Sequence, residues 1–336
     1  MRDLLSPVIV APMAGGPTGT ELVRAAAEMG TLGFLAAGYK TPAAVEDELR
    51  AVRGVPHGLN IFVPTPAPAD LEPLERYRLL LRDEADRYQV DLPPLRVGDD
   101  DEFAAKVELA IAYGTPLVSF TFGVPEPAVT RALRAAGSRV LITVTSAGEA
   151  RRALASAPDA LIAQAGAAGG HASTTSPAGY RGGSVAAEVL AAVRAVTDIP
   201  VIAAGGVASA ADVRALLGAG AAAVQCGTYF LLADEAGTRP AQRAAMLSGD
   251  YRETVVTRAF TGQPARALRN RFTDAYSAVA PIGYPAVHHL TAPIRAAAAK
   301  RGDPSALNLW AGTGFAAARA RPVADLIAGL VADLPD

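Results

Sequence analysis

The stretch ALIAQAGAAGGHAS, residues 160–173, joins a short apolar run to a glycine-rich turn that carries a histidine. Residues 160–164 are long enough for one buried strand, which ends on the polar Gln164. Glycines in the turn let the backbone approach a ligand closely. His171 follows them, and histidine is the side chain whose ordinary pKa lies nearest neutrality. The pattern fits a catalytic loop at the end of a parallel strand. It also fits an ordinary strand-to-helix turn with a surface histidine.

Seven further apolar runs of similar length accompany this one, and helical segments separate them. The eight predicted strands are 8–11, 32–36, 58–62, 117–121, 139–144, 160–164, 201–204 and 222–226. Uninterrupted apolar strands suit a sheet buried on both faces. Strict strand–helix alternation with eight repeats predicts an α/β fold, the (β/α)8 TIM barrel. An open doubly wound sheet is the alternative, but it requires a G-x-G-x-x-G turn that Gly15, Gly16 and Gly19 do not match.

The alternation stops after the eighth strand. The pattern predicts helices at 233–249 and 264–270, an extended segment at 254–260, a loop-rich piece at 277–293 and a last helix at about 322–330. We therefore expect a barrel made of residues 1–233 and 297–336. A smaller, mainly helical insertion at 234–296 is expected to cover the barrel mouth.

The composition excludes several classes of function. The 336 residues are 51% hydrophobic and 19% charged with a net charge of −2, so no surface for nucleic acid or an acidic membrane is indicated. Cys226 is the only cysteine, and the four histidines lack metal-binding spacing, so neither a disulfide nor a metal is expected. No signal peptide or membrane span is recognisable, which predicts a cytoplasmic protein. Nothing in the sequence specifies an oligomeric state.

Two of the predicted strands end in glycine-rich loops. Gly205 and Gly206 follow the seventh strand, and Gly227 and Thr228 follow the eighth. Glycine after a strand is also ordinary turn chemistry. In TIM barrels, however, these two loops often hold a phosphate through backbone N–H groups at the start of a helix. Their matching positions favour a phosphate site.

Several segments, in order along nearly the whole chain, resemble one protein family. They are APMAGG at 11–16, NIFVP at 60–64, VSFTFGVP at 118–125, AQAGAAGGHAS at 163–173, IPVIAAGGVAS at 199–209, VQCGTYFL at 224–231, RALRNRF at 266–272 and HLTAPIRAAAAKRGDP at 289–304. These resemble the nitronate monooxygenases, once called 2-nitropropane dioxygenases. The resemblance implies an FMN-containing TIM barrel with a smaller helical domain. Such an enzyme oxidises alkyl nitronates, or nitroalkanes, with O₂ to a carbonyl compound and nitrite.

The resemblance also implies the site. His171 corresponds to the family's catalytic histidine, which takes a proton from a nitroalkane or holds a nitronate. Residues implied for the substrate pocket are Thr121, Tyr284 and His288. Residues implied for FMN binding are Ala11, Pro12, Met13, Asn60, Gln164, Gly169, Gly170, Gly205, Gly206, Gln225, Cys226, Gly227 and Thr228. Asn60 and Gln164 can also be read from their chemistry, because amides at strand ends can donate and accept hydrogen bonds at the polar edge of a flavin.

This chain departs from the family pattern near His171. Ala167 stands where the family commonly has Glu, Ala172-Ser173 replaces Arg-Gly or Gly, and Thr121 replaces a histidine found in some members. These positions lie on the substrate side, so the resemblance constrains the cofactor more than the substrate. Two alternatives stay open: an FMN- and NAD(P)H-dependent enoyl-acyl carrier reductase, which shares the A-G-G-H loop, and a flavin-binding accessory protein of a biosynthetic complex.

Overall fold

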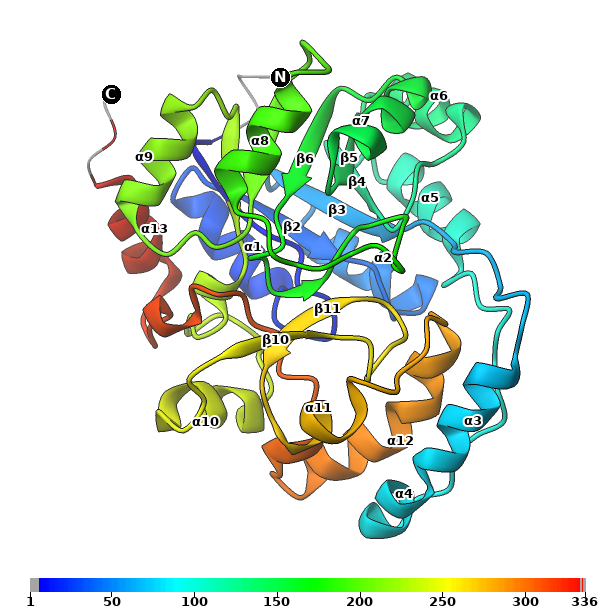
Figure 1. Ribbon diagram of the computed structural model, residues 1–336. Helices are drawn as coiled ribbons and strands as arrows, with labels where there is room; N and C mark the ends of the chain where they lie inside the picture. Colours follow the sequence, from blue (N-terminus) through cyan, green and yellow to red (C-terminus); the bar gives the residue numbers. More distant parts are fainter. Residues whose placement is uncertain (1–5, 333, 335–336) are drawn as a thin grey trace.

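A closed parallel barrel forms the centre of the computed structural model, which describes residues 6–332 and 334 (Figure 1). The barrel strands are β1 (Val8–Val10), β2 (Leu32–Ala36), β3 (His57–Phe62), β4 (Leu117–Thr121), β5 (Arg139–Val144), β6 (Ala160–Gln164), β8 (Val201–Ala204) and β9 (Ala223–Cys226). Each strand pairs with the next around the barrel, and β9 closes it by pairing with β1. Five strands have the predicted bounds, and the other three differ from them by one residue.

Helices follow the strands and wrap the outside of the barrel. They are α1 (Thr20–Glu28), α2 (Pro42–Ala51), α5 (Phe103–Ala112), α6 (Pro127–Ala135), α7 (Ala147–Ala153), α8 (Ala186–Arg194), α9 (Ala210–Gly218) and α13 (Val323–Val331). The last of them, α13, contacts α1, α9 and β1, and so completes the ring. The predicted (β/α)8 TIM barrel is therefore confirmed. No helix among the described residues has the length and apolarity needed to cross a membrane.

Inward-pointing side chains fill the barrel interior and determine how its strands pack. Phe34 occupies the space left by the missing side chain of Gly58, where a Cβ would lie only 2.3 Å from the phenyl ring. The buried interior cluster comprises Ile9, Leu32, Phe34, Leu117, Leu141, Ala160, Ile162, Ile202, Ala204 and Ala223. The barrel is thus a packed core, and space for a ligand is left only beyond its carboxyl end.

A second group of elements lies on one side of the barrel (Figure 1). Its sheet has the order β10–β11–β7, all antiparallel, and β7 belongs to the loop that leaves β6. Helices α3 and α4 contact α12 and share its core, although they precede β4 in the chain. We call this group the covering layer: β7 (Gly170–His171), β10 (Thr254–Thr257), β11 (Ala265–Leu268), α3 (Glu72–Leu80), α4 (Arg82–Tyr88), α10 (Pro240–Ser248), α11 (Arg271–Tyr276) and α12 (Ala286–Lys300). Short 3₁₀ helices are η2 (Leu154–Ser156), η3 (Thr228–Phe230), η4 (Pro304–Ala306) and η5 (Phe315–Ala317).

One expectation for the region after the barrel strands is wrong, and two are right only in part. The predicted helix at 264–270 is strand β11, because β10 and β7 pair with its two edges and override local propensity. The predicted helix at 233–249 is present only as α10. The predicted loop at 277–293 contains the first half of α12, whose Pro293 lies inside the helix and hides the pattern from a sequence reading. Its buried side chains nevertheless recur at helical spacing: Val287, Leu290, Ile294 and Ala298.

Candidate active site

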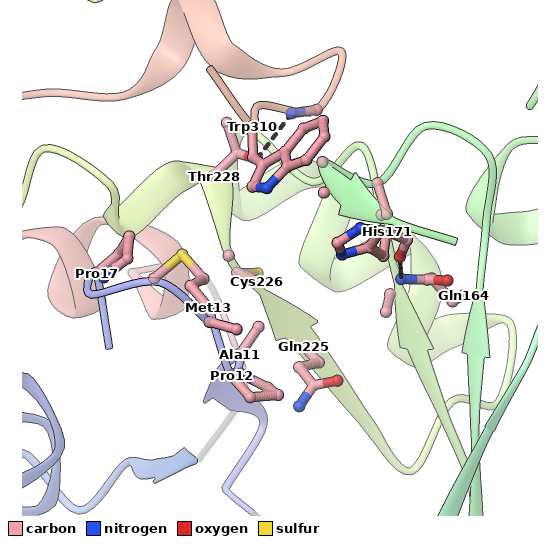
Figure 2. Close-up of a pocket in the computed structure, with 18 of the residues that line it drawn as sticks. Ala11, Pro12, Met13, Pro17, Gln164, His171, Gln225, Cys226, Thr228 and Trp310 are labelled. Carbon is pink, nitrogen blue, oxygen red and sulfur yellow. Dashed lines mark hydrogen bonds between the residues drawn. The ribbon is translucent and has the colours of Figure 1, made fainter. Parts of the chain in front are cut away.

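A large pocket opens where the carboxyl ends of the barrel strands meet the covering layer (Figure 2). It encloses about 1260 Å³ of empty space, part of it open to solvent. Every residue implied for FMN binding lines this pocket, and so do His171 and Thr121. In Figure 2, His171 and Gln164 lie across the space from Met13, Pro12 and Gln225.

The two remaining residues implied for the substrate pocket lie one layer behind its lining. The ring of His288 stacks on Tyr39 with a centroid separation of 4.2 Å. The ring of Tyr284 lies 5.9 Å from that of His171. Tyr284 and His288 therefore support side chains that face the pocket, while Tyr39 itself lines it.

Pairing between β7 and β11 fixes the backbone of His171, which stands opposite Ala265 in the ladder. His171 Nε2 lies 2.9 Å from Thr261 Oγ1, and the imidazole centroid lies 5.2 Å from the Trp310 ring. Burial, with a smaller contribution from the positive charge of Arg295, lowers the pKa of His171 to about 3. The imidazole is therefore neutral near pH 7 and keeps a free lone pair, while the same shift weakens it as a base.

Hydrogen bonds brace the loop that carries His171. Gln164 Nε2 donates to the His171 carbonyl oxygen at 3.0 Å (the dashed line in Figure 2), and Gln164 Oε1 accepts from Ser173 N at 2.7 Å. Ser173 Oγ donates to Thr143 O and accepts from Phe122 N. Both polar atoms of the Gln164 side chain therefore form hydrogen bonds with the loop. The second hydrogen on Nε2 remains available to a ligand. Ser173, which departs from the family pattern, therefore links the carboxyl ends of strands β4, β5 and β6.

The loops after β8 and β9 present backbone amides to the pocket. Gly205 and Gly206 have φ angles of +108° and +77°, a region that strongly favours glycine. No described residue accepts a hydrogen bond from the backbone N–H of Gly206, Gly227 or Thr228. Unpaired amides beside the first turn of η3 can donate hydrogen bonds to an anion. The structure therefore brings the two predicted phosphate loops together with their donors free.

Residues 310–314, WAGTG, complete this wall, and the sequence reading missed them. Gly312 N donates to Thr228 Oγ1 at 2.9 Å. A Cβ on Gly169 would lie 2.5 Å from Gly312 N, so the two loops meet too closely for a side chain. Gly312 and Gly314 were the only hint of this wall in the sequence. No neighbouring residue indicates that they lie beside the loop after β6, which begins more than a hundred residues earlier.

Two amide side chains supply the polar groups deeper in the pocket. Gln225 is buried, and its Nε2 has no hydrogen-bond partner among the described residues. Asn60 Nδ2 donates to Ser119 Oγ at 2.9 Å and lies 3.0 Å from Thr121 Oγ1. Asn60 Oδ1 accepts from Thr121 Oγ1 at 3.4 Å, and its second lone pair is available to a ligand. An unused donor and an unused acceptor above an apolar barrel fit the polar edge of an isoalloxazine ring. Together with the anion site, they fit a flavin that carries a phosphate.

Other groups in and near the pocket restrict its chemistry further. Arg239 lines it, and Arg239 Nη2 donates to Asn308 Oδ1 at 3.0 Å, but no ion pair joins Arg239 to a carboxylate of a described residue. Burial raises the pKa of the Cys226 thiol to about 12, so Cys226 stays protonated and is a poor nucleophile. Within residues 6–332 and 334, no cluster of three His, Cys, Asp or Glu side chains forms a metal site.

A comparison with protein families shows the family of this chain. The family model described as nitronate monooxygenase matches residues 1–333. The chain belongs to the nitronate monooxygenase family. It is a flavin-dependent oxidoreductase with the TIM-barrel fold.

Individual members and neighbours of the nitronate monooxygenase family match over almost the whole chain. A probable nitronate monooxygenase of Staphylococcus aureus (strain Newman) is 31% identical, over 98% of this chain and 95% of the relative. The crystal structure of nitroalkane oxidase from Streptomyces ansochromogenes has a TM-score of 0.94 and 43% identity, and covers 99% of this chain and 96% of the oxidase. FabK from Thermotoga maritima has a TM-score of 0.76 and 25% identity, with 98% and 94% coverage. The matches therefore include the covering layer as well as the barrel.

Proposed function

We propose that the protein binds FMN and oxidises alkyl nitronates, and neutral nitroalkanes, with O₂ to carbonyl compounds and nitrite. The observation that carries this proposal is the neutral, half-buried His171, which lines the same pocket as the unpaired backbone amides of the loops after β8 and β9. Family membership and the likeness to a nitroalkane oxidase support the substrate class. Two nitronate anions and one O₂ give two carbonyl compounds and two nitrite ions, which balances atoms and electrons.

Residues from two loops and two strands would hold the cofactor. The amides of Gly206, Gly227 and Thr228 suit the phosphate, and Asn60 and Gln225 suit the polar edge of the ring. FMN bound there would supply the electron-transfer chemistry between the substrate and O₂. The protein contributes position, exclusion of water and control of the proton.

His171 would act differently on the two substrate forms. A neutral nitroalkane must lose a proton from the carbon next to the nitro group, and the neutral imidazole accepts it. A nitronate has already lost that proton, so His171 then only positions the anion. This difference lets the base role be measured separately from flavin binding.

The substitution His171→Asn tests the proposal. We expect kcat/KM for neutral nitroethane to fall by about 10²–10⁴-fold, the usual contribution of a general base. Turnover of preformed ethyl nitronate should fall much less, and bound FMN should be unchanged by its absorbance spectrum. Oxygen uptake and nitrite release are the readouts. An equal loss with both substrates would contradict the base role.

Anaerobic mixing separates this proposal from the two alternatives. Loss of flavin absorbance on addition of ethyl nitronate, but not of NADH or NADPH, supports an oxidase-type enzyme. Fast bleaching by NADH or NADPH alone would identify a reductase instead. Bound FMN without turnover of any nitronate would favour the accessory protein.

A further inference from the structure

The two ring nitrogens of His171 have different surroundings. Nε2 is covered by Thr261, whose side chain is 1% exposed and whose Oγ1 lies 2.9 Å away. No hydrogen bond joins Nδ1 to any residue that the structure describes. Because His171 lines the pocket and Nε2 is directed into the covering layer, Nδ1 is the nitrogen that a ligand can reach.

Thr261 is held in place from several directions. It follows β10 in the turn that leads to β11, and Gln263 N donates to its Oγ1 at 3.4 Å. Gln263 Nε2 donates to the carbonyl oxygens of Ala172 and Thr174, both at 3.0 Å. These bonds tie the Thr261 turn to the loop just beyond His171. The distance between Thr261 and the imidazole therefore depends on buried hydrogen bonds and not on a mobile surface contact.

The hydroxyl group of Thr261 has one hydrogen and two candidate acceptors. It can donate to the Gln263 carbonyl oxygen at 3.3 Å or to His171 Nε2 at 2.9 Å. In the first arrangement Nε2 carries the proton and donates to Thr261, and Nδ1 keeps a free lone pair. In the second arrangement the proton sits on Nδ1, and the imidazole presents a donor to the pocket.

We propose that Thr261 is a positioning residue that holds His171 as the Nε2–H tautomer, so that Nδ1 is the atom that accepts the substrate proton. This inference rests on the proposed function, since only the first arrangement gives the pocket a base. The proton leaves the substrate carbon and bonds to Nδ1, while the C–H electron pair moves onto the nitro group and gives the nitronate. The imidazolium that results keeps its Nε2–H bond to Thr261 Oγ1.

The tautomer can be read directly by two-bond ¹H–¹⁵N NMR correlations of the FMN-loaded protein labelled with ¹⁵N-histidine. The spectrum of His171→Asn assigns the His171 signals. We expect the Nε2–H pattern in the wild type and a mixture of tautomers in Thr261→Val. An Nδ1–H pattern in the wild type would overturn the proposal without any measurement of activity.

Kinetics give the second readout. Thr261→Val should lower kcat/KM for neutral nitroethane about 10- to 100-fold, a part of the general-base contribution, and should leave ethyl nitronate turnover within about twofold. Thr261→Ser keeps the hydroxyl and should restore nitroethane turnover. Thr130→Val is a matched control, because Thr130 is buried on α6 and its hydroxyl has no hydrogen-bond partner among the described residues.

The outcomes distinguish this inference from the proposed function. Wild-type turnover of nitroethane by Thr261→Val, together with loss in His171→Asn, would overturn the role of Thr261 alone. If the wild-type enzyme turned over neither nitroethane nor ethyl nitronate, the proposed function would fail. The measured tautomer would still support or overturn the assignment to Thr261.

Discussion

The pocket has two sides that are built by opposite means. The glycine side, Gly205, Gly206, Gly227 and Thr228, offers backbone amides from loops that directly follow barrel strands. The histidine side, His171, Thr261 and Trp310, offers side chains from three distant segments that meet at β7 and β11. One side therefore depends on local backbone conformation, and the other on long-range pairing. Cofactor binding and proton transfer should then fail separately when each side is altered.

For FMN binding, the largest effect is expected from altering the glycine side. In Gly206→Val a Cβ would lie 2.9 Å from the Ala167 Cβ, and the φ of +77° is unfavourable for valine. Strain of this kind amounts to about 1–3 kcal/mol, so FMN affinity should fall by about 100-fold, measured by fluorescence titration. Gly218→Ala, at an open position in α9, is the control and should bind FMN normally. Normal FMN affinity in Gly206→Val would contradict the role of this side.

Substitution of Arg266 should loosen the packing of the histidine side. Its guanidinium donates to Gly166 O at 2.7 Å, Gly182 O at 2.6 Å and Thr254 Oγ1 at 2.8 Å, and so clamps two loops to β11. Charged hydrogen bonds contribute about 1.5–3 kcal/mol each, but the site is only half-buried. We therefore expect Arg266→Met to lose about 2–3 kcal/mol of unfolding free energy in a urea titration.

A neighbouring arginine provides the control for this prediction. Arg269 pairs with Glu253 and Asp274 at the exposed surface, where ion pairs add little stability. Arg269→Met should therefore change the unfolding free energy much less than Arg266→Met does. Arg266→Met should also lower nitroethane turnover more than FMN affinity. A loss of FMN affinity as large as the loss of turnover would show that the two sides are coupled.

The pH dependence of turnover sharpens the comparison, because it concerns the histidine side alone. A histidine with the ordinary pKa of about 6.5 would be protonated at pH 5, and turnover would fall about 30-fold from its neutral-pH value. The pKa of His171 is lowered to about 3, so its neutral form persists and kcat/KM for nitroethane should stay flat between about pH 5 and 7. A decline with an apparent pKa near 6.5 would contradict the burial of this imidazole in the active enzyme.

The smallest effect on stability is expected from a substitution on α6, which belongs to neither side of the pocket. The Thr130 hydroxyl is buried without a partner, so Thr130→Val removes an unfavourable group and should leave stability unchanged or raise it by about 1 kcal/mol. Thermal unfolding measures this. A destabilisation above about 1 kcal/mol would mean that the hydroxyl has a partner, such as an ordered water.

The barrel and the glycine side could be predicted because their signals are local. Apolar runs and the glycines that end them are contiguous in sequence, and five strands had the observed bounds. The covering layer could not be predicted as well, because β11 is a strand only through pairing with β10 and β7. For the same reason Thr261 and Trp310 carried no signal of their own. Tyr284 and His288 were placed near the site by resemblance, but only packing decides that Tyr39 stands in front of His288.

The contact between His171 and Thr261 spans 90 residues of chain, and it has a consequence for protein synthesis. When the ribosome has translated β9, every strand of the barrel exists, but the turn that orients the imidazole does not. The imidazole of His171 therefore gains its Thr261 contact only after the turn before β11 has been added, late in translation. A nascent chain that has the barrel strands alone carries His171 without this contact.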